Sequence, residues 1–169
     1  NTLLGEVPEV KNFFVSCGLN SIGIGSGGGV GKVTAEWLIN GHVNEDIFCY
    51  DIKRFQKFHS DLGFIKKSIT ESLGDLYGMH WPFKQHKTSR NIKTLPYHEE
   101  LKSFGACFGV AGGYERPMWF ALDGEKTEYE YSYNYQNWYP SAEYETSNTV
   151  KNVGLFDLTP FSKFEIRSE

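Results

Sequence analysis

The sequence predicts an α+β fold, because helix-like and strand-like patterns follow one another along its 169 residues. Residues 12–17 are a short apolar run of the kind that forms a buried strand. Residues 62–77 carry apolar side chains at every fourth position, which indicates an amphipathic helix. Residues 105–122 are typical of a strand, a Gly112-Gly113 turn and a following aromatic segment.

The first unit is expected to be a strand, a glycine-rich turn and a helix. After the strand at 12–17, apolar residues at positions 30, 33, 37 and 38 fall on one helical face. The helix is therefore predicted to start near Gly29 and to end with Gly41 as its C-terminal cap. Residues 18–29 would then form the turn.

The glycine-rich turn contains two patterns found in nucleotide-binding proteins. Gly23-x-Gly25-x-x-Gly28 matches the dinucleotide fingerprint, and Gly31-Lys32 is similar to the end of a phosphate loop. The phosphate loop is excluded, because Ser26 stands at its first glycine and Val33 at its hydroxyl residue. The dinucleotide fingerprint is weak, since the acids at 45–46 lie in a polar spacer and not at the tip of a second parallel strand.

A glycine-rich turn at a helix start can also bind ligands other than phosphates. It lets a ligand approach backbone N–H groups, and the helix dipole favours negative charge there. A reduced flavin carries negative charge over its N1 and C2 carbonyl, so such a helix end could stabilise it. A close-packed turn without a ligand is the alternative that the residues leave open.

The middle of the chain is expected to be mainly helical. Asp61 is the predicted N-cap of the helix at 62–77, whose apolar face should pack in a core. Residues 80–96 are polar, contain two prolines and predict an extended connector. Residues 97–104 are expected to form a short helix.

The last third is predicted to contain further strands and one helix. Between 127 and 135 every second residue is tyrosine, so a strand there would present one tyrosine face. That face is expected to pack against a neighbouring element, and a stacking platform for bases or sugars is the alternative. A helix is predicted from Ser141 to Val153, and residues 154–166 regain strand character.

Composition and charge exclude several function classes. The formal net charge is -4 and the 17 basic residues are scattered, which argues against a nucleic-acid partner or an anionic membrane partner. No run of 18 apolar residues exists that could span a membrane. The five histidines and three cysteines lack metal-ligand spacing, so we expect no metal site, no disulfide framework and no catalytic residue of this kind. A reducing compartment is expected.

The two ends suggest a segment of a longer protein. The first residue is Asn1 and not Met, and the last stretch, KFEIRSE, breaks off just after a strand-like alternation. Part of the core is therefore expected to come from other sequence.

Four stretches in register carry a resemblance to a known family: FFVSCGLNSIGIGSGGGVGKVTAEWLING, DIKRF, GACFGVAGGYERPMWF and GLFDLTPFSKFEI. In order and spacing they resemble the sarcosine and dimethylglycine dehydrogenases and their relative, the regulatory subunit of pyruvate dehydrogenase phosphatase. The resemblance implies the end of a D-amino-acid-oxidase-like FAD domain at 1–46 and a mainly helical central segment at 47–104. Residues 105–169 would begin an aminomethyltransferase-like, folate-binding domain.

The resemblance also implies a flavin site at the glycine-rich stretch. The corresponding loop in the wider oxidase family runs beside the flavin ring, which carries over onto Asn20, Ser21, Ile22, Gly23, Ile24 and Gly25. Related amine oxidases often have a lysine at the position of Gly25 that helps to hold the substrate carboxylate, and this chain has no such anchor there. Within FDLTPFSKF, Pro160 departs from the family's usual small residue, so an edge strand or a bulge is expected.

The function that follows from the resemblance is the oxidative demethylation of an N-methylated glycine by FAD, with one-carbon transfer to tetrahydrofolate. It implies a small amine substrate and an electron acceptor, either a protein or oxygen, and it leaves the oligomeric state open. The family's catalytic residues lie outside this segment, so none is assigned. Cytoplasmic localisation is expected, with the mitochondrial matrix as the alternative. A non-catalytic regulatory relative is the alternative function, and a small nucleotide-binding domain is a weaker one.

Overall fold

The computed structural model describes residues 2–168, which divide into two compact units at Ile65 and Lys66. Its elements are, in chain order, β1 (Leu3–Glu6), β2 (Phe14–Cys17), α1 (Gly23–Asn40), η1 (Ile52–Arg54), η2 (Lys57–Ser60), α2 (Leu62–Asp75), α3 (His98–Ser103), β3 (Ala106–Ala111), β4 (Tyr114–Phe120) and α4 (Tyr139–Lys151). The two sheets are two-stranded, so the chain is mixed α and β, as predicted. None of the helices in the described part combines the length and apolarity needed to cross a membrane.

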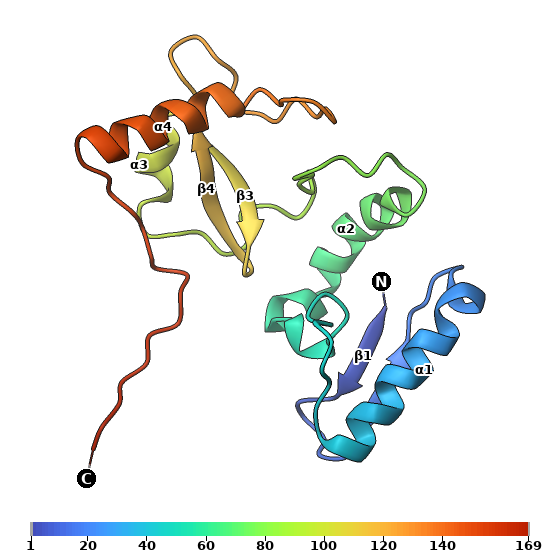
Figure 1. Ribbon diagram of the computed structural model, residues 1–169. Helices are drawn as coiled ribbons and strands as arrows, with labels where there is room; N and C mark the ends of the chain where they lie inside the picture. The colour runs from blue at the N-terminus through green and yellow to red at the C-terminus, as the bar shows by residue number, and fades with distance from the viewer. Residues whose placement is uncertain (1, 169) are drawn as a thin grey trace. The chain divides into compact units, whose positions relative to one another are not determined.

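The first unit is a β-hairpin packed against α1 (Figure 1). β1 and β2 pair antiparallel, with Leu3 opposite Cys17. The ring of Trp37 on α1 meets Phe14 edge-to-face at 6.0 Å. At Gly5 φ is 108°, and an added Cβ would lie 2.5 Å from the Trp37 ring, so only glycine fits this contact.

Two expectations for the first unit are wrong. The strand predicted at 12–17 is present as β2, but it is shorter and not buried, since Phe14 and Val15 are half-buried and the next two residues are exposed. Its partner is the antiparallel β1. The predicted helix starts six residues too late, since α1 begins at Gly23 and not near Gly29. The C-terminal cap is confirmed: Gly41 has φ 75°, and its N–H donates to the Trp37 carbonyl.

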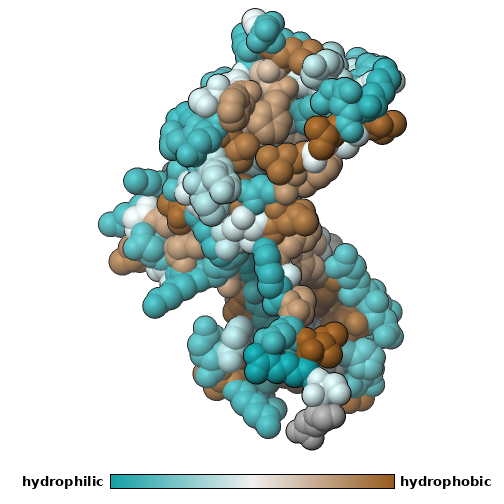
Figure 2. All heavy atoms as spheres, turned by 90° about the vertical axis from the view of Figure 1, so that its left-hand side faces the viewer, coloured by the Kyte–Doolittle hydropathy of each residue, from teal (hydrophilic) through white to brown (hydrophobic). Residues whose placement is uncertain are grey.

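Helix α2 has the predicted start but not the predicted burial. The side chain of Asp61 accepts a hydrogen bond of 2.9 Å from the Phe64 N–H, as an N-cap should. Ile69 and Leu73 are 57% and 58% exposed, so the apolar face that was expected to pack in a core is open among the described residues. Figure 2 shows apolar side chains at the surface among hydrophilic ones.

The second unit is built around the hairpin of β3 and β4. Gly112 and Gly113 form its turn with φ of 60° and 79°, as the sequence predicts. A register shift between Cys107 and Phe108 leaves an extra residue on β4, which is a β-bulge. Helices α3 and α4 pack on this hairpin (Figure 1). The buried apolar residues of the second unit are Leu95, Ala106, Cys107 and Trp119.

The tyrosine segment is not a strand, contrary to the prediction. Residues 127–135 are irregular with two bends, and their backbone pairs with no neighbouring strand. The tyrosines pack against other rings, as was expected of them. Tyr129 stacks on Tyr131 at 5.6 Å, and Tyr133 packs on Trp81 at 4.9 Å.

Residues 154–166 also lack the predicted strand, so the edge or bulge expected at Pro160 does not form either. Figure 1 draws them as an extended tail. Leu155 is 101% exposed and Ile166 is 96% exposed. The apolar side chains of this strand-like sequence therefore have no partner strand among the described residues.

Candidate functional site

The candidate site is the start of α1, where the chain turns sharply between strand and helix. After β2 the backbone passes through Asn20 and Ser21, whose φ angles of 38° and 68° lie in the left-handed region. Non-glycine residues there cost about 1–3 kcal/mol each and are enriched at functional sites, although asparagine tolerates the region best. Ile22 follows with its N–H bonded to the Leu19 carbonyl at 2.9 Å, and α1 begins at Gly23.

The electrostatics at this helix start favour an anion. The first N–H groups of an α-helix have no partner within the helix, and together with the aligned peptide dipoles they act as about half a positive charge. Ile22 provides no side-chain cap, and the first turn contains no acidic residue. The N–H groups at Gly23, Ile24 and Gly25 are therefore the ones that a negatively charged group could approach.

The glycines of α1 are unusual because packing within the chain does not require most of them. The helix contains six glycines in 18 residues, and each costs up to about 1 kcal/mol relative to alanine in a helix interior. An added Cβ would meet nothing within 4 Å at five of them: Gly25, Gly27, Gly28, Gly29 and Gly31. These positions leave the backbone of α1 accessible to close approach by another group.

The structure brings the six sequence-predicted site residues together in one continuous turn. Asn20, Ser21 and Ile22 precede the helix, and Gly23, Ile24 and Gly25 form its first turn. Ile24 is 104% exposed and Ile22 is 57% exposed, which leaves this end of α1 open to solvent. Their geometry differs from the expectation in one respect: Gly23 and Gly25 are helical and do not belong to a turn before the helix.

A second group of polar residues, which the sequence did not reveal, lies under the hairpin of the second unit. Arg90 donates from Nε to Oε1 of Glu115 at 2.7 Å and from Nη2 to Oε2 at 2.5 Å, and Asn91 N–H also donates to Glu115. Glu115 is 2% exposed. Its burial alone would raise the pKa of this carboxyl, but the bonds from Arg90 and Asn91 outweigh it and hold the pKa below the usual value.

This pair anchors the connector to β4. Arg90 also donates to the carbonyls of His86 and Phe108. Strand β4 therefore contributes a buried acid, Glu115, that fixes the preceding loop. Strand alternation could have indicated that Glu115 faces inward, but the sequence offered no signal for Arg90 as its partner.

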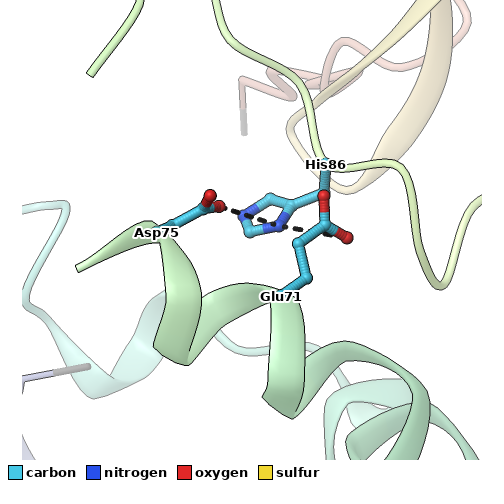
Figure 3. A group of neighbouring side chains, drawn as sticks. All are labelled: Glu71, Asp75 and His86. Carbon is cyan, nitrogen blue, oxygen red and sulfur yellow. Dashed lines mark ion pairs between the residues drawn. The ribbon is translucent and has the colours of Figure 1, made fainter. Parts of the chain in front are cut away.

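A third group consists of Glu71, Asp75 and His86 (Figure 3). One ligand atom from each residue lies within 4.8 Å of the others. The i, i+4 spacing of the two acids on α2 was visible in the sequence, but His86 comes from the connector, whose path the sequence did not predict.

In comparisons with known proteins, two family models match the chain. Residues 40–94 match the FAD dependent oxidoreductase central domain, and residues 97–169 match the GCVT N-terminal domain. The chain is 41% identical over 166 residues to 4-methylaminobutanoate oxidase (formaldehyde-forming) of Paenarthrobacter nicotinovorans, covering 98% of this chain and 20% of that protein.

Two mouse proteins show similar coverage. Identity is 34% to the sarcosine dehydrogenase, mitochondrial, of Mus musculus, over 94% of this chain and 17% of that protein. It is 32% to the pyruvate dehydrogenase phosphatase regulatory subunit, mitochondrial, of Mus musculus, over 98% of this chain and 19% of that protein. The chain thus spans about a fifth of the length of these relatives. It belongs to the FAD dependent oxidoreductase family that contains the sarcosine and dimethylglycine dehydrogenases and the pyruvate dehydrogenase phosphatase regulatory subunit.

Proposed function

We propose that this chain is part of a flavin-dependent oxidoreductase that oxidatively demethylates an N-methylated glycine, such as sarcosine or dimethylglycine, and passes the one-carbon unit to tetrahydrofolate. The observation that carries the proposal is the start of α1, which is uncapped, free of acids and rich in glycines that the described residues do not contact. The match of the chain to FAD dependent oxidoreductases supports flavin as the group that would lie there.

The residues at the start of α1 fit such a group. A bound flavin supplies an acceptor for a hydride equivalent from the N-methyl carbon, and its N1 and C2 carbonyl region becomes negative on reduction. The N–H groups of Gly23, Ile24 and Gly25 would face that region and stabilise the negative charge. The absence of a Cβ at Gly25 leaves room for close approach, since nothing described lies within 4 Å of that position.

The start of α1 also limits where the substrate is held. Gly25 offers no cation for a substrate carboxylate, so other residues must bind that group. A site without a fixed carboxylate anchor at this position suits N-methylated amino acids of more than one chain length. The 41% identity to a protein named for 4-methylaminobutanoate makes that compound a second substrate to test beside the N-methylated glycines.

The proposal assigns a role to each segment. Residues 1–46 end the D-amino-acid-oxidase-like FAD domain, residues 47–104 form the central segment, and residues 105–169 begin the folate-binding domain. The match of residues 97–169 to the GCVT N-terminal domain supports the last assignment. Two of the relatives above are named as mitochondrial, which favours the mitochondrial matrix, and no comparison supports the cytoplasmic expectation.

The test is a flavin spectrum of the protein produced from the complete reading frame. We expect bound flavin whose absorbance bleaches under anaerobic conditions on addition of sarcosine, dimethylglycine or 4-methylaminobutanoate. With oxygen or an artificial acceptor and tetrahydrofolate present, less free formaldehyde should appear than without tetrahydrofolate. A preparation that binds flavin but bleaches with none of the three amines would contradict the proposal.

Flavin that is bound but not bleached by any of the three amines would favour a regulatory protein without turnover. The 32% identity to the pyruvate dehydrogenase phosphatase regulatory subunit covers as much of the chain as the identity to the oxidase does. The two functions differ at the bleaching step, because a regulatory relative has no need to reduce its flavin.

A further inference from the structure

We propose that Glu71, Asp75 and His86 form a binding site for a divalent transition metal ion such as Zn²⁺. The site lies within the second unit, where two carboxylates on α2 and one imidazole on the connector point toward one another (Figure 3). It revises the expectation of no metal site, which rested on the spacing of histidines and cysteines alone. The proposal is independent of the flavin site at α1.

The geometry is close to that of a bound ion. Glu71 and Asp75 are four residues apart on α2 and therefore lie on the same face of the helix. His86 Nδ1 is 3.7 Å from Asp75 Oδ2 and 3.9 Å from Glu71 Oε2. Two ligand atoms bonded tetrahedrally to Zn²⁺ at about 2.0–2.2 Å are roughly 3.3–3.6 Å apart, so small side-chain rotations would close the site.

Both carboxylates are held in place by contacts outside the group. Glu71 accepts from the Lys87 and Thr88 N–H groups at 2.7 Å each and also from the Thr88 hydroxyl. Lys84 pairs with Asp75 through Oδ1, which leaves Oδ2 directed at His86. Contacts of this kind orient ligands and strengthen metal binding.

The ligand set selects the class of metal. An imidazole with two carboxylates suits Zn²⁺ and its first-row neighbours, whereas Ca²⁺ and Mg²⁺ prefer oxygen ligands only. The two carboxylates supply negative charge for a divalent ion, and Lys84 neutralises part of it. The side chain of His86 is 52% exposed, so water can complete the coordination. The charge of Lys84 opposes a bound cation.

The experiment measures Zn²⁺ binding by the full-length protein after treatment with a chelator. Isothermal titration should show one saturable site per chain. His86→Ala should weaken binding by at least about 10-fold, the scale found even for residues that only orient a ligand. Lys84→Met should tighten it, because the opposing charge is removed. His80→Ala is the matched control, since His80 is exposed on the same connector and contributes only its backbone carbonyl to a hydrogen bond.

Four results would overturn the proposal: no saturable site in the unaltered protein, unchanged affinity in His86→Ala, an equal loss in His80→Ala, or no gain in Lys84→Met. Asp75→Asn gives a second test if His86→Ala disturbs folding, because it keeps the shape of the side chain and removes its charge. It should weaken Zn²⁺ binding by a similar factor, and unchanged binding would again count against the site.

Discussion

Adding one methyl group at Gly25 separates the flavin proposal from a purely structural view of α1. Gly25→Ala places a Cβ where nothing described lies within 4 Å, and Gly31→Ala does the same later in the helix. Among the described residues, neither change creates a clash and both favour the helix. If the start of α1 contacts flavin, only Gly25→Ala harms flavin binding.

The magnitudes follow from two opposing effects. Gly31 lies inside α1, so alanine there should stabilise the helix by about 1 kcal/mol, and Gly25 in the first turn should gain less. A methyl group forced into a close-packed contact costs about 1–3 kcal/mol. For Gly25→Ala this corresponds to a flavin affinity about 5- to 150-fold weaker. Gly31→Ala should leave flavin affinity unchanged.

The assay compares the two variants as full-length protein. The apoprotein is titrated with FAD by fluorescence quenching, and the melting temperature of each apoprotein is recorded as a check on the helix. Equal flavin affinities in the two variants, together with equal or higher melting temperatures, would refute the assignment of Asn20 to Gly25 as flavin neighbours.

Two further predictions concern the second unit. Glu115→Ala should lower the free energy of urea unfolding, followed by tryptophan fluorescence, by about 3 kcal/mol, because Arg90 is left half-buried without its partner. Since the folded pKa of Glu115 is depressed, the stabilisation that its carboxylate provides is present above the ordinary glutamate pKa and is lost as the pH falls through the folded pKa. Glu115→Gln should therefore flatten the dependence of the unfolding free energy on pH, and the same dependence in the variant would contradict this reasoning. Burial raises the pKa of Cys107 to about 11, so at pH 8 iodoacetamide should modify this thiol only after denaturation. Mass spectrometry detects the modification, and rapid labelling of the native protein would contradict the prediction by showing that the thiol is accessible.

The sequence predicted those elements that local signals define. The Asp61 cap, the Gly41 cap and the Gly112-Gly113 hairpin turn are each set by residues within one or two turns of the backbone. The start of α1 was misplaced because glycine disfavours helices, and six of them suggested a turn. Tertiary context overrides that preference here, with Trp37 holding α1 against the hairpin.

Contacts between residues far apart in the sequence could not be predicted from the sequence. Arg90 and Glu115 are 25 positions apart, and Glu71 and His86 are 15 apart. In each pair the partner lies on the connector at 80–96, which has no periodic pattern that would fix its path. The six residues at the start of α1 were identified through family resemblance, and the structure adds that they form one continuous, exposed turn.

The two segments that were wrongly predicted as strands fail for different physical reasons. At 127–135 the tyrosines pack against aromatic rings of one another and of Trp81, so ring packing replaces strand pairing. At 154–166 such packing is limited to a few contacts, such as Arg116 over the Phe161 ring at 5.0 Å, while Phe164 is 88% exposed and Ile166 is 96% exposed. Because backbone N–H and C=O groups in a strand need partners, an alternating pattern becomes a strand only when a sheet edge is available to it.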